Sequence, residues 1–357
     1  MSWNGDPQVA SVVGRSAEDL LERRPRRQRL DGFDDAYSDI VDYIVRCTHR
    51  IWEEKNVGLI HTHYSVDCPV FALSGNSKGA EVVVRNTLAS LAGHPDRSPI
   101  AEDVIWSEDG TGIFHSSHRL MSASAHLGPD SMLGPAVAGG HAAIPVIADC
   151  VCSDNLIIEE WLVRDYVLFA RQFGVDPRTI AERLAREDQE GDQARHAWLQ
   201  LEADRVRAFS NCRPPPQHPA ARIVLALENA FSQDLYGLAS EAVSPSIEVS
   251  WPGGRSLVGR GAWIGCLMQL RTPMGELRFV LDHFAARPLP DGDVAVALRW
   301  WLLGRHIANG VWGPPTGRNL VVLAISHYRL RNGRVLEDFT VFDEVGVLRQ
   351  AAGGLGA

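Results

Sequence analysis

Apolar side chains recur at helical spacing in two segments that lie far apart in the chain. In residues 35–55 and again in residues 220–231 they fall three or four positions apart. Each segment therefore predicts an amphipathic helix. A second helix is expected to open after Gly79 in the first half and after Gly259 in the second.

Each helical region leads into a series of predicted strands. Branched and aromatic residues gather in runs bounded by polar turn residues, which is typical of β-structure. Brief strands are expected at residues 69–73 and 247–251, and longer strands at 113–126, 141–152, 156–165, 294–306, 319–330 and 334–343. Helices followed by an antiparallel sheet predict an α+β fold, in which a curved sheet wraps a helix and encloses a pocket.

The two halves of the chain are copies of one module. Residues 156–172 align with residues 334–350 at a constant offset of 178 residues, with six identities in seventeen positions. The identical pairs are Glu159/Glu337, Val163/Val341, Asp165/Asp343, Val167/Val345, Arg171/Arg349 and Gln172/Gln350. So long a period indicates domain duplication rather than a solenoid. The repeat predicts two modules, at residues 35–175 and 218–352.

An arm and a linker account for the remaining residues. Residues 1–34 hold a basic cluster at positions 23–27 and are expected to form a mobile N-terminal arm. Residues 176–217 combine spaced apolar side chains with dense charge and end in a proline-rich run. That combination predicts one or two surface helices followed by a stiff spacer.

Composition limits the class of partner. With 35 basic against 44 acidic side chains, the formal charge is −9 and the pI about 5.8. Neither nucleic acid nor an anionic membrane is therefore an expected partner. No leader pattern or bilayer-spanning apolar run is present, which predicts a cytoplasmic protein. The six cysteines are too sparse for a disulfide scaffold, so reduced thiols are expected. The chain shows no glycine-rich phosphate loop, serine elbow or zinc-ligand pattern, and we expect no cofactor and no metal.

The last predicted strand of the first module carries the leading candidate for chemistry. A period of two places Glu159, Trp161 and Asp165 on one face of that strand. If this face lines the concave side of the sheet, burial would raise the pKa of Asp165 and suit it to proton removal beside a carbonyl. An alternative stays open, in which Asp165 and its counterpart Asp343 cap the helices that follow.

Histidines and one carboxylate on the preceding strands are candidate partners of Asp165. Imidazoles on the polar strand 113–126 could stabilise an enolate oxygen. Asp149 lies in an apolar run, where a carboxylate is costly to bury unless it is paired or used. The catalytic candidates are Asp165, His126, Asp149 and His118. The expected substrate contacts are Trp161, Glu159 and His115 in the first module and Asp343, His306, His327 and Phe339 in the second.

The remaining motifs connect both modules to a known family. The second module contains His306-x3-Gly310-x2-Gly313-Pro-Pro-Thr-Gly-Arg318, then Tyr328-Arg329-Leu330-x-Asn332-Gly333-Arg334 and the pair Glu337 and Asp343. The first contains Gly79-x-Glu81, His94-Pro95-Asp96 and Glu160-Trp161-x3-Asp165. Together these motifs resemble the SnoaL-like polyketide cyclase family of the NTF2-like superfamily. The resemblance implies tandem cone-shaped α+β barrels and cofactor-free aldol chemistry. It also implies an acid–base role for Asp165 or Asp343, assisted by His126 or His306.

Three functions are consistent with these residues. The first is a cofactor-independent cyclase, isomerase or lyase that acts on a small carbonyl compound, with Asp165 as general acid or base. The second is a non-catalytic protein that binds a small ligand or docks a partner, and the third is a hydratase or hydrolase that uses an Asp-activated water. The expected partner is a small molecule. Since NTF2-like modules commonly pair sheet to sheet, we also predict an intramolecular pseudo-dimer, with further homo-oligomers left open.

Overall fold

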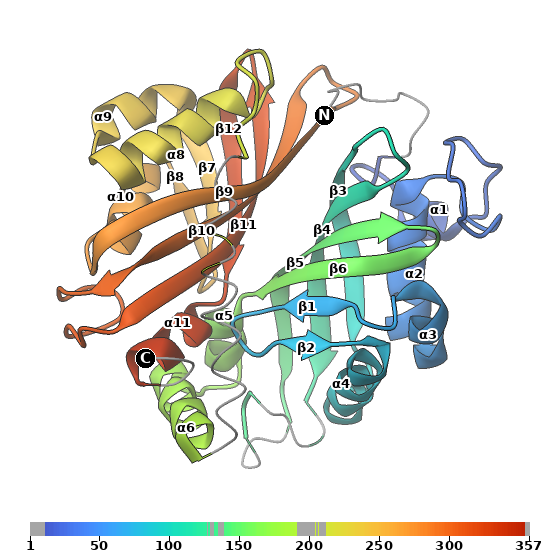
Figure 1. The fold of residues 1–357 in the computed structure, drawn as a ribbon, viewed down its shortest axis with the longest axis horizontal. Coiled ribbons are helices and arrows are strands. Elements are labelled where there is room, and N and C mark those ends of the chain that lie inside the picture. Colours follow the sequence, from blue (N-terminus) through green and yellow to red (C-terminus); the bar gives the residue numbers. More distant parts are fainter. Residues whose placement is uncertain are drawn as a thin grey trace. The chain divides into compact units, whose positions relative to one another are not determined.

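The computed structural model describes residues 11–126, 128, 132–134, 139–190, 204, 206 and 212–353. These residues form two compact units (Figure 1). The first contains the described residues up to Arg164, together with Gln172–Gly174. The second contains Asp165–Arg171 and the described residues from Val175 onward. Each unit contains one six-stranded mixed sheet with helices on one side, so the predicted α+β class and the two sheet-bearing modules are confirmed.

The sheet of the first unit has the strand order β2-β1-β6-β5-β4-β3. Only the pairing of β1 with β6 joins parallel strands, and the other neighbours are antiparallel. The strands are β1 (Pro69–Phe71), β2 (Ser77–Lys78), β3 (Ser98–Glu108), β4 (Phe114–Ala125), β5 (His141–Ser153) and β6 (Leu156–Arg164). The helical elements are α1 (Ala17–Leu21), α2 (Ile40–Trp52), η1 (Val57–Leu59), α3 (Ile60–His63) and α4 (Ala80–Gly93).

Helix α2 is the central helix of the first unit. It begins at Asp39, whose side chain accepts a hydrogen bond of 2.9 Å from the backbone N–H of Asp42. Its apolar face includes Tyr43 and Ile44, which pack in one core with Phe114 of β4 and Cys150 of β5. This packing fixes which face of the sheet looks toward α2, the face that we call the helix side.

The second unit repeats this plan with the order β8-β7-β12-β11-β10-β9. Its strands are β7 (Val243–Trp251), β8 (Arg255–Val258), β9 (Met274–Pro288), β10 (Val294–His306), β11 (Asn319–Arg331) and β12 (Arg334–Phe342). Its helical elements are α5 (Tyr166–Gln172), α6 (Pro177–Glu190), α8 (Ala221–Gln233), α9 (Tyr236–Ala239), η2 (Ser240–Ala242), α10 (Arg260–Arg271) and α11 (Glu344–Ala351). Aromatic contacts between Phe231 of α8 and Trp300 of β10 mark the helix side of this sheet.

Glycines open the second helix of both modules, as the sequence predicts. Gly79 precedes α4 with φ +93° and Gly259 precedes α10 with φ +101°, a backbone region that favours glycine. The N–H of Gly79 donates a 2.8 Å hydrogen bond to the carbonyl of Cys68, which directly precedes β1, and the N–H of Gly259 donates one of 2.8 Å to the carbonyl of Ile247 in β7. A Cβ on Gly79 would also lie 2.8 Å from the carbonyl oxygen of Val66.

Identical glutamines of the repeat hold corresponding strands. The side chain of Gln172 accepts from the N–H of Ala143 at 2.9 Å and donates to its carbonyl at 3.2 Å. Gln350 makes the same two bonds to Val321, at 2.8 and 2.9 Å. Each glutamine thus satisfies the backbone of the third long strand of its sheet, which explains why this residue recurs in both modules.

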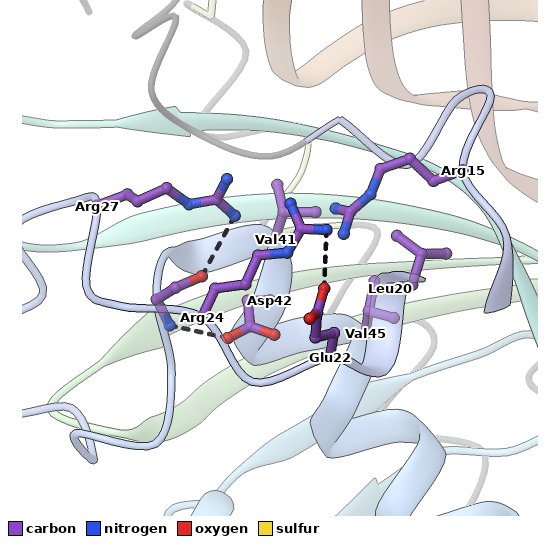
Figure 2. A pocket seen from close by; sticks show the side chains of 9 residues that line it. Arg15, Leu20, Glu22, Arg24, Arg27, Val41, Asp42 and Val45 are labelled. Atoms are coloured by element: carbon purple, nitrogen blue, oxygen red, sulfur yellow. Dashed lines mark hydrogen bonds and ion pairs between the residues drawn. The ribbon is translucent and has the colours of Figure 1, made fainter. Parts of the chain in front are cut away.

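The described part of the N-terminal arm packs on α2. Leu20, Leu30 and Phe33 are buried in the same core as the apolar face of that helix. Figure 2 shows Arg15, Arg24 and Arg27 gathered over α2, around a cavity of about 10 Å³, which is at the lower limit of the space that one water needs. The prediction of a mobile arm omitted these apolar anchors, which lie between the charged residues. Residues 1–10 lie outside the described part.

One predicted linker helix is described. Helix α6 buries Ile180 and Leu184, and its Asp188 forms a buried ion pair with Arg349 of α11 in the same unit. A second helix predicted within residues 191–210 falls almost wholly outside the described residues. Among the residues that the structure describes, no helix is long and apolar enough to cross a membrane.

Candidate functional site

Both aspartates singled out from the repeat cap helices. Asp165 precedes α5, and its Oδ1 accepts a 2.9 Å bond from the N–H of Leu168. The same carboxylate accepts from the N–H groups of Gly253, at 2.9 and 2.7 Å, and of Gly254, at 3.2 Å. Burial raises the pKa of Asp165, while these bonds oppose the shift. Asp343 caps α11 through the N–H of Gly346 at 2.9 Å.

The sequence analysis favoured the face of β6 that carries Glu159, Trp161 and Asp165, but the opposite face of this strand looks toward the helices. Cys150 packs on the helix side and pairs across the ladder with Glu160, so Glu160 faces the helices. Glu159 is exposed, and Trp161 lies on the opposite face beside Asp149. Side chains alternate between the two faces of a strand. A shift of one residue therefore moves every residue assigned to one face onto the other.

Glu160 is the buried carboxyl group on the helix side of β6. It is 7% exposed, and its Oε2 accepts a hydrogen bond of 3.2 Å from the hydroxyl of Tyr64, the residue that ends α3. Desolvation raises the pKa of Glu160 above its ordinary value of 4.5, against smaller opposing effects of Arg164 and Tyr64. The group is therefore able to exchange a proton closer to neutrality than an exposed glutamate would.

His118 lies on the same face, two strands away. It pairs with Ala148 of β5, whose own partner on β6 is Leu162, the next helix-side residue after Glu160. His118 is 2% exposed, and its Nε2 has no hydrogen bond in the structure. Desolvation lowers its pKa to about 4, so the ring is neutral at pH 7.

Several apolar side chains around these polar groups are only partly buried. Ala148, Leu162, Trp106 and Tyr64 all pack against the helix-side core, yet each keeps some exposure. These residues are therefore less completely buried than the rest of the core against which they pack. We call this region, from Glu160 to His118, the first-module chamber.

Four thiols surround the chamber. They belong to Cys47, Cys68, Cys150 and Cys152, and all are buried. Desolvation is the main cause that raises the pKa of each thiol, and the charge of Glu160 contributes in every case. The thiols are thus protonated and weakly nucleophilic.

In the second module the corresponding acid is Asp338, which lies in a closed hydrogen-bond network. Its Oδ2 accepts from the indole N–H of Trp263 at 2.7 Å, and its Oδ1 accepts from the hydroxyl of Thr340 at 2.6 Å. Thr340 contacts Ser326 at 2.7 Å, and Trp300 donates to Ser326 at 2.9 Å. Asp338 is 2% exposed, and desolvation raises its pKa from 3.8 to about 7.

Large side chains fill the helix side of the second sheet. Trp263, Trp300 and Phe231 are buried there, and so are the strand residues beside Asp338. The buried helix-side residues of β10, β11 and β12 include Val296, Leu298, Trp300, Leu302, Val322, Ala324, Ser326, Tyr328, Asp338, Thr340 and Phe342. The second module therefore has large buried side chains at the positions where the first has partly exposed ones.

The other predicted histidines lie away from both carboxyl groups of the interior. His126 follows β4, and its ring lies 4.9 Å from that of His94 and 5.4 Å from that of Phe173. His306 occupies the matching place after β10, with its Nδ1 3.1 Å from the hydroxyl of Thr316. His115 lies on the face of β4 opposite to His118. His327 and Phe339 pair on the face of β11 and β12 opposite to Asp338.

The groups that the sequence interpretation missed are Tyr64, Glu160, Trp263, Asp338 and Thr340. One signal for two of them was present, because Glu160 and Asp338 align as acids in the repeat. The tyrosine and the tryptophan come from helices, and their approach to the last strand follows only from tertiary packing. Among the described residues, no group of three or more His, Cys, Asp or Glu side chains is arranged to hold a metal ion.

Both modules combine a mixed β-sheet with helices, and in each the last strand carries a buried acid on its helix side. Residues 221–351 match the family of SnoaL-like polyketide cyclases, which confirms the predicted resemblance for the second module. A search of curated protein sequences gives no match.

Three of the solved structures to which the chain is similar are the following. One, from Jannaschia sp. CCS1, is a proposed SnoaL-like polyketide cyclase with 17% identity, covering 40% of this chain and 98% of its own, at a TM-score of 0.32. A proposed polyketide cyclase from Acidithiobacillus ferrooxidans has 23% identity over 39% and 99% of the two chains, also at 0.32. The proposed polyketide cyclase IdmH from Streptomyces antibioticus has 22% identity over 38% and 98%, again at 0.32.

Proposed function

We propose that the protein is a cofactor-independent acid–base enzyme of the SnoaL-like cyclase type, and that its reaction takes place in the first-module chamber. The observation that carries this proposal is the placement of Glu160, a buried carboxyl group with a raised pKa beside partly exposed apolar walls. Glu160 replaces Asp165 as the proposed general acid or base, because the oxygens of Asp165 are occupied by backbone N–H groups.

The proposed reaction is proton transfer next to a carbonyl group. The carboxylate form of Glu160 takes a proton from the carbon beside the carbonyl of the substrate, and the electron pair of the C–H bond moves to form an enolate. In an aldol cyclisation the enolate carbon then forms a bond to a second carbonyl carbon of the same molecule. The alkoxide that results takes the proton back from Glu160, so the enzyme ends unchanged.

Two neutral groups are suited to stabilise the enolate oxygen. The hydroxyl of Tyr64 already contacts Glu160, and His118 has a ring nitrogen without a partner on the same face. A neutral donor in an apolar site stabilises developing negative charge more strongly than it would in water. Isomerisation and lyase reactions begin with the same proton removal, so the site supports this reaction class as a whole.

Exchange of carbon-bound hydrogen tests the proposal without knowledge of the natural substrate. The probe is 2-tetralone in D₂O, with deuterium uptake beside its carbonyl followed by NMR. We expect catalysed exchange by the wild-type protein, a loss of at least about tenfold in Glu160→Gln, and little change in the matched variant Asp338→Asn. Tight binding of the ketone without catalysed exchange would instead support a non-catalytic ligand-binding protein.

A further inference from the structure

Helix α3 of the first unit is short, and its position depends on the side chains that it buries. It contains only the four residues Ile60–His63, and a helix of one turn has little stability of its own. Its buried side chains are those of Ile60 and His63. The next residue is Tyr64, whose hydroxyl donates to Glu160 at 3.2 Å. The contacts of His63 therefore bear on the placement of this hydroxyl.

His63 belongs to a chain of hydrogen bonds that runs in one direction. Its Nδ1 lies 3.2 Å from the carbonyl oxygen of Leu59 and 2.9 Å from the hydroxyl of Thr62, which itself donates to that carbonyl at 3.0 Å. Because a carbonyl only accepts and the hydroxyl proton is already used, Nδ1 carries the ring proton. The lone pair of Nε2 then accepts from the hydroxyl of Tyr37 at 2.7 Å.

Arg50 of α2 completes the chain. Its guanidinium donates to the hydroxyl oxygen of Tyr37 at 3.1 Å, and Tyr37 is completely buried. This hydroxyl thus accepts from Arg50 and donates to His63, which requires a neutral imidazole. A second ring proton would take the acceptor away from Tyr37 and place a positive ring beside the same oxygen that the guanidinium contacts.

The surroundings of His63 favour its neutral form. The titratable and charged groups near the ring are Arg50 and Tyr43 of α2, Tyr37 and Asp34 before that helix, and Tyr64 after α3. Burial lowers the pKa of His63 below its ordinary value of 6.5, and the charge of Arg50 adds to this effect. The carbonyl of Leu59 and the charge of Asp34 oppose it. The ring therefore takes up a proton only in more acid solution than an exposed histidine does.

We propose that neutral His63 positions Tyr64, and that protonation of His63 separates the Tyr64 hydroxyl from Glu160. The imidazolium loses its bond from Tyr37 and is repelled by Arg50, so the end of α3 moves and Tyr64 moves with it. The first-module site then loses this hydroxyl as pH falls. As a regulation of the site the inference rests on the proposed function. Its test follows a side-chain contact rather than a reaction, so the two can fail separately.

The ¹³C NMR signals of the tyrosine Cζ atoms test the proposal in the full-length protein. The chain has six tyrosines, and the signal of Tyr64 is assigned by its loss in Tyr64→Phe. Titration of Glu160 is removed by Glu160→Gln, whose amide oxygen can still accept from Tyr64. In Glu160→Gln we expect the Tyr64 signal to shift as pH falls, with a midpoint below 6.5, because His63 then gains its second proton.

Two further variants separate His63 from the other histidines. His63→Gln, made together with Glu160→Gln, offers Tyr37 a neutral acceptor at every pH, so the shift of the Tyr64 signal should disappear. His61→Gln in the same Glu160→Gln background is the matched control. It changes an exposed histidine of the same helix, whose Nε2 lies 3.9 Å from Glu81, and it should leave the shift in place.

A second measurement needs no variant of His63. The ring carbon signal of His63 in Glu160→Gln should titrate with the same midpoint as the Tyr64 signal. Different midpoints, or a shift that persists in His63→Gln, would overturn the proposal. So would a Tyr64 signal that stays constant at every pH at which the protein remains folded. The bond of 2.9 Å from the N–H of Ser65 to the carbonyl of Ile157 would then hold Tyr64 without His63. None of these results depends on ketone exchange, so a failure of the proposed reaction is recognised separately.

Discussion

Burial raises the pKa of both Glu160 and Asp165, yet the two carboxyl groups have different partners. Asp165 accepts from the N–H groups of Leu168, Gly253 and Gly254, so its two oxygens serve the backbone. Glu160 accepts from the hydroxyl of Tyr64 and lies beside partly exposed side chains. At the scale of single residues, hydrogen-bond partners therefore separate the structural acid from the candidate catalyst more clearly than pKa does.

Removing either cap should cost stability. We expect Asp165→Ala and Asp343→Ala each to lower the free energy of unfolding by about 1–2 kcal/mol, because each leaves helical N–H groups without an acceptor. Urea unfolding of both variants checks this. A cap role for Asp165 would be contradicted if Asp165→Asn lost hydrogen exchange of the ketone completely while its urea midpoint stayed at the wild-type value.

The acid of the second module should make stability depend on pH. Burial raises the pKa of Asp338 from 3.8 to about 7, so between these values the native state keeps a proton that the unfolded chain has released. This contribution to stability is fully present below about pH 4 and is lost as pH rises through about 7. Each unit of pKa difference corresponds to about 1.4 kcal/mol.

Asp338→Asn removes this titration while keeping the shape of the side chain. We expect the wild type to lose stability relative to Asp338→Asn between pH 4 and 8, measured as the difference between their free energies of unfolding in urea. The Asn side chain has both an acceptor for Trp263 and a donor for Thr340, so the variant should fold. A constant difference across this range would show that Asp338 is ionised in the native state.

At the scale of elements, the sequence predicts those strands that carry continuous apolar runs. The three longest strand predictions of the second module differ from β10, β11 and β12 by no more than one residue at each end. Strands β3 and β9 were not predicted. Pro99, Glu102 and Asp103 interrupt the apolar pattern of β3, and charged residues interrupt that of β9. Both are edge strands, where polar side chains meet solvent and periodicity is weak.

The faces of the strands were harder to predict than their bounds. Alternation gives two sets of residues on β6 but does not say which set meets the helices. The wrong set was preferred because it contained a tryptophan and two acids. The packing of Cys150 in the core around α2 shows which face of the sheet meets the helices. This contact joins residues about a hundred positions apart, so the local sequence of β6 does not indicate it.

The two glutamines that hold β5 and β11 should differ in strength. Gln350 is buried and Gln172 is exposed, although both make the same pair of backbone bonds. We expect Gln350→Ala to cost about 1–3 kcal/mol, since the backbone of Val321 stays buried without a partner, and Gln172→Ala to cost less because water can replace the side chain. Amide exchange at Val321 and Ala143 checks this order, and equal protection in both variants would contradict it.

At the scale of the whole molecule, the repeated residues and the differing residues have separate roles. Two of the six identical pairs are the helix caps Asp165 and Asp343 and the strand-holding glutamines Gln172 and Gln350. The interior positions differ, with Cys150 and Leu162 in the first module replaced by Tyr328 and Thr340 in the second. A common framework thus carries partly exposed inner side chains in one copy and a packed interior in the other.

Labelling with dicyclohexylcarbodiimide tests this contrast most directly. The reagent is apolar and attacks protonated carboxyl groups that it can reach, and burial raises the pKa of Glu160 and of Asp338, so both hold a proton more readily than exposed carboxyl groups do. Mass spectrometry of the native protein should find Glu160 modified and Asp338 intact, with the modification lost in Glu160→Gln. Modification of Asp338 before Glu160, or of neither residue, would contradict an accessible acid in the first module.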